Sequence, residues 1–304
     1  MSNEMIDRVR RIRPALERRA RIFSSVRSFF VGRGFLEVDT PVRIYAPAPE
    51  PHIDAIPAEG QYLRTSPELQ MKCMLAAGYG RIFQIGSCFR QGEIGRLHRE
   101  EFAMLEWYEA GAGYMDLARF AKEMIVKVSS EVNGSARITF RGKEIDLAGE
   151  WYEISVDDAF RQFAGVAVAD AIATNEYERL LVDKVEPALP ADRPCILRDY
   201  PAALASLARL KPENPAFSER WELYVGGVEI ANTYGELVDA AEQKRRFEQD
   251  TDRRASARKL VYPVDKTFQA ALDLGIPAAS GSALGLDRLV MVLTGSDSLD
   301  EVRY

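Results

Sequence analysis

The sequence has few of the residues that bind zinc or form disulfides. Its 304 residues include three cysteines, Cys73, Cys88 and Cys195, and two histidines. The cysteines form no C-x-x-C pair, so cysteine and histidine together do not make a convincing zinc site. An odd number of scattered cysteines is typical of a reducing compartment, and we therefore expect a cytoplasmic protein.

The sequence also lacks a basic excess and any long apolar run. Lys and Arg total 40 against 46 Asp and Glu, and the formal net charge of −6 argues against strong nonspecific binding to nucleic acids. A local basic pocket remains compatible with this charge. No apolar run reaches the length of a membrane span, and the N-terminal MSNEMIDRVRRIRP has no apolar signal-peptide segment. We expect neither a membrane protein nor a cleaved leader.

The N-terminal region predicts a helix followed by a short strand. Apolar residues recur at helical spacing over 14–31, Pro14 suits a first turn, and glycines follow the pattern. FLEVDTP at 35–41 then predicts a strand closed by Pro41. The pair is either an ordinary core element or a subunit contact. Further on, Ser66-Pro67-Glu68 is a typical helix start, in which Glu68 could serve only as a capping acid.

The stretch CFRQGEIGRLHREEFAMLEWYE at 88–109 predicts a strand, a charged loop and a second strand. The returning strand carries Glu106 beside Trp107 and Tyr108. The possible cations of the loop are Arg90, Arg96, His98 and Arg99. The loop therefore suits an anionic ligand, and the strand suits a cationic one.

WELYVGGVEIANTYGEL at 221–237 predicts a hairpin with a turn at Gly226-Gly227. In that register Glu222 and Glu229 lie diagonally on one face, which is either solvated or able to hold a divalent cation against a phosphate. Three polar residues of the second strand have the opposite parity: Asn232, Tyr234 and Glu236. They point away unless the strand kinks near Ala231.

ASGSALGLDRLVMVLTG at 279–295 predicts a glycine-rich strand leading into an apolar helix, with Asp287 and Arg288 in its first turn. Such a junction serves tight packing about as often as it serves phosphate binding.

Taken in order, three segments resemble motifs 1, 2 and 3 of class II aminoacyl-tRNA synthetases. They are the helix, strand and proline at 14–41, FR…EF…LEW at 89–107 and G-x-A-L-G-L-D-R at 281–288. TSPEL at 65–69, YPAALASLAR at 200–209 and GGVEIANTYGELVDAAEQ at 226–243 resemble the lysyl branch. The resemblance implies an α+β fold, with a mostly antiparallel sheet flanked by helices. It also implies a single catalytic domain over 1–304 with a mixed insertion at about 131–195, and a homodimer formed through motif 1.

Lysyl-tRNA synthetases carry an anticodon-binding β-barrel before motif 1, for which this sequence leaves no stretch, so we expect no anticodon reading. A free-standing catalytic domain of this branch resembles the elongation factor P β-lysine ligase family. That family activates (R)-β-lysine with ATP and transfers it to a lysine of elongation factor P. Ala283 agrees, because the β-lysine ligases have alanine where lysyl-tRNA synthetases have glycine. The implied cofactors are ATP and Mg²⁺.

The resemblance implies a role for each matching residue. Arg90 contacts the α-phosphate and the substrate carboxylate, and Arg288 faces the γ-phosphate; these are the expected catalytic residues. The rest of the expected ATP site comprises His98, Phe102, Glu229, Ile230 and Gly285, with Phe102 and Arg288 on the two faces of adenine. The expected Mg²⁺ ligands are Glu222 and Glu229. The expected residues for a dibasic amino acid are Ser66, Pro67, Glu68, Glu106, Tyr108, Asn232, Tyr234, Glu236 and Ala283.

Motif 2 departs from the family pattern. Phe-Arg-x-Glu is usual, whereas this sequence has Gly92 in the fourth position and an acid only at Glu93; Arg99 also replaces the usual asparagine after the histidine. Three alternatives therefore stay open. They are an elongation factor P ligase, a ligase or amide synthetase with another amino acid or acceptor, and a non-catalytic paralogue. The retention of Arg90, Glu222, Glu229 and Arg288 speaks against the last.

Overall fold

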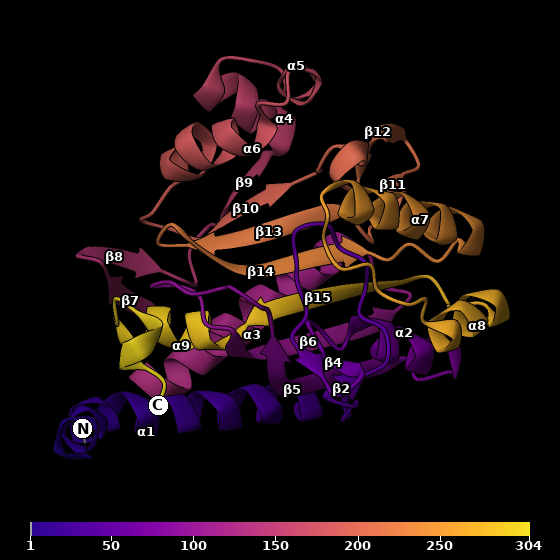
Figure 1. Ribbon diagram of the computed structural model, residues 1–304. Helices are drawn as coiled ribbons and strands as arrows, with labels where there is room; N and C mark the ends of the chain where they lie inside the picture. The colour runs from indigo at the N-terminus through magenta and orange to yellow at the C-terminus, as the bar shows by residue number, and fades with distance from the viewer. Residues whose placement is uncertain (1) are drawn as a thin grey trace.

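The computed structural model describes residues 2–304, with side chains from Glu4 onward, and is built on one large sheet (Figure 1). In spatial order the strands are β1 (Leu36–Glu37), β5 (Arg81–Phe89), β6 (Glu101–Ala110), β15 (Ala279–Gly285), β14 (Val228–Gly235), β13 (Arg220–Val225), β10 (Cys195–Arg198) and β9 (Tyr152–Ser155). Only the outermost pairs, β1 with β5 and β9 with β10, are parallel. The predicted mostly antiparallel sheet flanked by helices is confirmed.

One face of the sheet is covered by helices, and the other is left for the site. The covering helices are α1 (Ser2–Gly32), α3 (Tyr114–Asn133) and α9 (Leu286–Thr294) (Figure 1). Their apolar side chains form the main core with odd-numbered residues of the strands, among them Leu105, Trp107 and Leu223. Successive side chains of a strand point to opposite faces, so the even-numbered residues of β6 and β13 face the other way.

Two details of the N-terminal prediction are wrong. The first helix starts at Ser2 rather than near Pro14, which lies inside α1. The helix extends further because its buried stripe continues upstream to Ile12, which is 7% exposed. The strand expected over 35–41 is limited to β1, because the N–H and hydroxyl of Thr40 donate to the side chain of Gln84 (3.1 and 3.0 Å).

Smaller elements surround the site face. Between β1 and β5 the chain forms β2 (Arg43–Ile44), β3 (Pro57–Ala58), β4 (Gln61–Leu63) and α2 (Glu68–Ala76). Late in the chain come η4 (Ala202–Leu204), β11 (Leu210–Lys211), β12 (Asn214–Ser218), α7 (Ala240–Ser256), α8 (Lys266–Leu274) and η5 (Leu299–Glu301). Helix α2 begins where the sequence predicts, with the hydroxyl of Ser66 accepting the N–H of Glu68 at 3.0 Å.

The segment at about 131–195 has its own elements. They are β7 (Arg137–Phe140), β8 (Lys143–Asp146), α4 (Val156–Ala159), η1 (Phe160–Ala164), α5 (Val168–Ala173), α6 (Tyr177–Leu180), η2 (Leu181–Val185) and η3 (Glu186–Ala188). A second apolar cluster lies beneath them, and β9 joins this segment to the edge of the main sheet.

The predicted hairpin forms β13 and β14, and a bulge decides which of its side chains share a face. Tyr224 pairs with Glu229 as expected, but the next pair is Leu223 with Ala231, which leaves Ile230 as an extra residue. The bulge restores parity, so the polar residues beyond it lie on the same face as Glu229. The alternative in which the strand kinks near Ala231 is therefore correct.

No helix in the described range 2–304 has the length and apolar character to cross a membrane. Cys73, Cys88 and Cys195 are all free thiols.

Candidate active site

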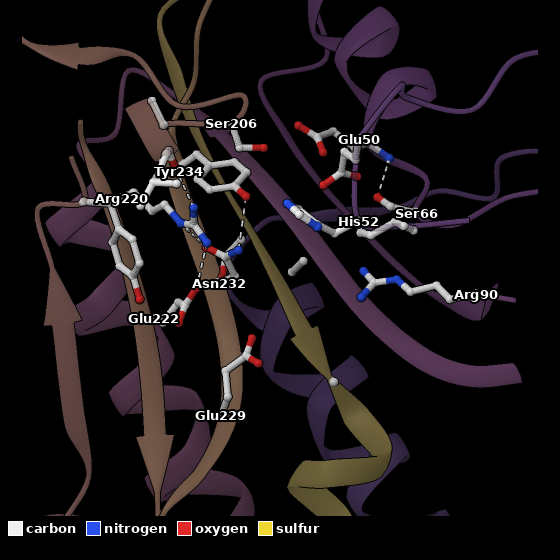
Figure 2. A pocket seen from close by; sticks show the side chains of 18 of the residues that line it. Glu50, His52, Ser66, Arg90, Ser206, Arg220, Glu222, Glu229, Asn232 and Tyr234 are labelled. Carbon is white, nitrogen blue, oxygen red and sulfur yellow. Dashed lines mark hydrogen bonds and ion pairs between the residues drawn. The ribbon is translucent and has the colours of Figure 1, made fainter. Parts of the chain in front are cut away.

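A cavity of about 810 Å³ lies over the open face of the sheet and collects nearly all the predicted site residues. Figure 2 shows its two walls: Arg220, Glu222 and Asn232 on one side, and Ser66 and Arg90 on the other. Among the predicted residues, all but Pro67 line the cavity.

Carboxylates gather at the inner end of the cavity around a buried lysine. The ammonium of Lys72 lies 2.6 Å from Glu68 and 2.5 Å from Glu236, and Lys72 is fully buried. Next to this pair, Glu106 accepts hydrogen bonds from the hydroxyls of Ser66 (2.8 Å) and Tyr108 (2.6 Å). Glu106 and Glu236 are each 1% exposed. These carboxylates are therefore functional groups of the interior rather than surface charges.

The acidic end has more negative charge than Lys72 can balance. Burial, then Glu68, raises the pKa of Glu106 to about 8. Burial also raises the pKa of Glu236 to about 7, although Lys72 lowers it. Burial disfavours the charged form of Lys72, but Glu236 and Glu68 outweigh it and hold its pKa above the usual range. Burial and the repulsion between neighbouring acids raise these pKa values, and a bound cation would lower them.

Small residues form the floor between these acids. A Cβ atom on Gly281 would lie 2.2 Å from a ring carbon of Tyr108 and 2.4 Å from Glu236, so this position excludes a side chain. Two residues along, Ala283 pairs with Glu106 on β6 and with Asn232 on β14. Its methyl group therefore lies on the cavity floor, between an acid and an amide.

Arg220 was missed by the sequence analysis, although it is two residues from Glu222 on the same strand face. Its guanidinium donates to Glu222 (2.7 Å) and Asn232 (3.3 Å) and lies between the rings of Tyr200 and Tyr234, 4.2 and 5.5 Å from their centroids. These contacts fix the positions of Glu222 and Asn232 before any ligand binds.

Arg90, the motif 2 arginine, retains unused donors in the cavity. Its guanidinium lies 5.1 Å from the centroid of the Phe102 ring and 3.7 Å from Glu93. Its Nε is buried, with no hydrogen-bond partner among residues 2–304. A buried donor without a partner is costly unless a ligand satisfies it, and a planar guanidinium suits a phosphate or carboxylate. Glu93, not the glycine at 92, supplies the acid beside this arginine.

Arg288, the motif 3 arginine, connects three parts of the site. It donates to the carbonyl of Glu229 (2.9 Å) and to its carboxylate (3.1 Å). It also donates to the carbonyl of Leu97 (3.2 Å) and lies 2.8 Å from Nε2 of His98 in the motif 2 loop. Burial and the charge of Arg288 lower the pKa of His98, so the imidazole is neutral and can accept from the guanidinium.

Glu222 and Glu229 meet the requirements of a metal site completed by a ligand. Burial and the nearby Glu222 raise the pKa of Glu229, a repulsion that a divalent cation would relieve. No cluster of three or more acidic, histidine or cysteine residues that could hold a metal occurs in the described part of the chain. Mg²⁺ is commonly held by one or two carboxylates with substrate phosphates and water, so the two residues fit this ion.

Backbone geometry places the remaining predicted residues. The side chain of Ile230 is 2% exposed and packs in the main core, so this residue can offer only its backbone to the cavity. Gly285 ends β15 directly before α9, beside Arg288.

Lys72, like Arg220, was not predicted from the sequence. Its position four residues after Glu68 on a helix could have indicated that the two side chains pair.

Comparisons with known proteins identify the family to which the chain belongs. The family model for tRNA synthetases class II (D, K and N) matches residues 3–304. The chain is 38% identical to an elongation factor P–(R)-β-lysine ligase of Klebsiella pneumoniae over 95% of this chain and 94% of that protein. It is 37% identical to the same-named protein of Proteus mirabilis over 94% and 93%.

The lysine–tRNA ligase of Moorella thermoacetica is 34% identical over 93% of this chain, which spans 63% of that relative. The family match covers nearly all of the sequence, and both groups of relatives exceed 30% identity. The chain belongs to the family of class II tRNA synthetases (D, K and N) and is similar to the elongation factor P–(R)-β-lysine ligases along almost its whole length.

Proposed function

We propose that this amino acid ligase activates (R)-β-lysine, or lysine, with ATP and transfers it to a lysine side chain of elongation factor P. The observation that carries the proposal is the near full-length similarity to ligases of that name, combined with a buried acidic pocket beside two cavity arginines. A dibasic amino acid brings the cations that such a pocket lacks.

In the first step the amino acid carboxylate attacks the α-phosphorus of ATP, and pyrophosphate leaves. Both reactants are anions, so the protein's contribution is positioning and fixed positive charge. Arg90 holds the carboxylate and the α-phosphate with the donors that it leaves unused, and Phe102 offers its ring to adenine. Glu229 and His98 hold Arg288, which in this proposal faces the γ-phosphate and the adenine face opposite Phe102.

When bound, Mg²⁺ would neutralise charge on the phosphates, and Glu222 and Glu229 would hold it. Arg220 and the hydroxyl of Tyr224 (2.8 Å) keep Glu222 in place for this task.

In the second step the side-chain nitrogen of the acceptor lysine attacks the acyl carbon. The bond from that carbon to the phosphate oxygen breaks, AMP leaves, and the nitrogen loses a proton as the amide forms. No tRNA is needed, and no anticodon is read. The enzyme acts in the cytoplasm.

The floor residue Ala283 supports β-lysine over lysine. Its methyl group lies between Glu106 and Asn232, two of the residues proposed to bind the amino acid. The amino group of β-lysine is one carbon further from the carboxylate than that of lysine. The two isomers therefore place different atoms against the methyl group of Ala283.

We also propose a homodimer through α1 and the motif 1 strand. Several large apolar side chains of this region are exposed in the single chain: Met5, Ile6, Val31 and Leu36. A second copy would cover them.

A ligase for another amino acid or acceptor, including an amide synthetase, is the second candidate. The motif 2 loop favours it, because Gly92 stands in the usual glutamate position and Glu93 pairs with Arg90 instead. A panel of amino acids in pyrophosphate exchange separates the two candidates, since a preference for an amino acid other than lysine or β-lysine supports this one. Failure to form any adenylate would instead indicate a non-catalytic paralogue.

The direct test is incubation with elongation factor P, ATP and (R)-β-lysine, followed by mass spectrometry of the intact factor. We expect a mass increase of one lysyl group, and none in a factor whose acceptor lysine is replaced by arginine. An unmodified factor, from enzyme shown to be active in pyrophosphate exchange, would refute the acceptor.

A further inference from the structure

One carboxylate of the cavity has no role in the reaction as described above. Glu50 lies in the 45–56 loop, between β2 and β3, and is partly buried. Figure 2 shows it on the wall beside Ser66 and His52, across the cavity from Tyr234 and Ser206. Among residues 2–304, nothing forms a hydrogen bond or ion pair with its carboxylate, whereas Glu68, Glu106 and Glu236 are all paired.

The backbone around Glu50 is held firmly, so its position is set by the fold. The buried guanidinium of Arg254 donates to the carbonyls of Glu50 (2.7 Å) and Ile53 (2.9 Å) and to the carboxylate of Asp54 (2.7 Å). The carbonyl of Asp54 accepts the N–H of Gln91 at 2.7 Å. Because Gln91 directly follows Arg90, the loop and the motif 2 arginine are positioned together.

The charges near Glu50 show which end of the cavity it serves. Burial, then the charge of Glu68, raises its pKa to about 7, while Arg90 and Arg220 oppose the rise and Asp250 adds to it. The hydrogen bond from Gln91 to Asp54 ties the Glu50 loop to the motif 2 arginine, whereas Glu106 is bonded to Tyr108 and Glu236 is paired with Lys72. Glu50 therefore lies toward the end at which Arg90 would receive the reacting carboxylate, and the other two acids lie toward the distal end.

Resting on the proposed function, we propose that Glu50 binds the amino group nearest the reacting carboxylate of the substrate and selects for amino acids that carry it. The ammonium group of the substrate would lie between Glu50 and Glu68. It would supply the ion-pair partner that the Glu50 carboxylate lacks in the free protein. Glu106, Tyr108 and Glu236 then remain for the distal ammonium. A partly buried carboxylate without a partner in the free protein reduces stability, and a binding role explains why it is present.

The test compares Glu50→Gln with Glu59→Gln, an exposed control on the next turn. Pyrophosphate exchange is measured with lysine, (R)-β-lysine, 6-aminohexanoate, which lacks the amino group near the carboxylate, and norleucine, which lacks the distal one. We expect Glu50→Gln to raise KM for lysine and β-lysine at least about tenfold with KM for ATP unchanged. It should also remove the preference of the wild type for lysine over 6-aminohexanoate. The preference for lysine over norleucine should persist, and Glu59→Gln should match the wild type.

An equal loss for lysine and 6-aminohexanoate would overturn the assignment, because a merely structural role weakens both. A wild-type enzyme that activates neither lysine nor β-lysine would instead refute the proposed function.

Thermal melting tests whether the Glu50→Gln variant is correctly folded. The raised pKa means that the ionised Glu50 destabilises the free protein above about pH 7, so Glu50→Gln should melt at the same or a higher temperature there. A lower melting temperature would show that the carboxylate supports the fold, and would also overturn the assignment. Glu50→Asp, which keeps the charge, should retain part of the preference.

Discussion

The ammonium of Lys72 lies 2.5 Å from the carboxylate of Glu236, and both side chains are buried inside the cavity wall. Lys72 also contacts Glu68 at 2.6 Å, so a single cation holds two of the acids assigned to the substrate. The protein thus supplies part of the positive charge itself. A dibasic substrate would supply the rest.

Replacing Lys72 by methionine should therefore destabilise the protein strongly. Removing one partner of a buried ion pair leaves an uncompensated charge and costs about 3 to 5 kcal/mol in the free energy of unfolding. Urea denaturation measures this loss, which should be smaller at pH 5, because Glu236, whose pKa is raised to about 7, takes up a proton there. Lys127→Met is the matched control, because Lys127 pairs with Glu131 on the exposed face of α3. A loss for Lys72→Met no larger than the control would contradict the role given to this lysine.

Binding of the amino acid should tighten as pH rises through 7 to 8. Glu236 and Glu106 have pKa values raised to about 7 and about 8, and only their ionised forms attract an ammonium group. Below pH 6 these acids are protonated, so KM for the amino acid should be roughly tenfold higher at pH 6 than at pH 8.5. KM for ATP serves as the internal comparison. A KM for the amino acid that does not change with pH would show that these acids do not bind it.

Arg90→Ala should reduce adenylate formation by at least about a hundredfold, because no other side chain of the motif 2 loop offers a planar donor at that point. The measurement is ATP–pyrophosphate exchange at saturating amino acid. Arg96→Ala is the control, since Arg96 lies in the same loop with its side chain 66% exposed. Near-normal exchange by the Arg90 variant would remove this residue from the catalytic set.

Ala283→Gly should shift preference from (R)-β-lysine toward lysine. The substitution removes the methyl group on the floor between Glu106 and Asn232 and leaves the pairing of β15 with its neighbours unchanged. The ratio of kcat/KM for the two isomers is the appropriate readout, because it cancels general losses of stability. Equal ratios in the variant and the wild type would refute this account of the floor.

The order of motifs in the sequence was sufficient to predict the sheet and most of the cavity, because together they resemble a family whose fold and site residues are known. The sequence left open whether the strand kinks near Ala231, since one extra residue in a strand leaves no compositional trace, and only the strand pairing shows the bulge at Ile230. Lys72 was overlooked because a lysine is almost always exposed. Glu50 was overlooked because its proline-rich loop has no periodic pattern, and its place depends on contacts with distant residues such as Arg254.

The most direct test of the central claim is ATP–pyrophosphate exchange without tRNA, over a panel of amino acids. The account predicts exchange with (R)-β-lysine, weaker exchange with lysine, and almost none with norleucine or other amino acids that have a single amino group. Exchange supported best by a neutral amino acid would contradict the claim that the buried acids of this cavity bind a dibasic substrate.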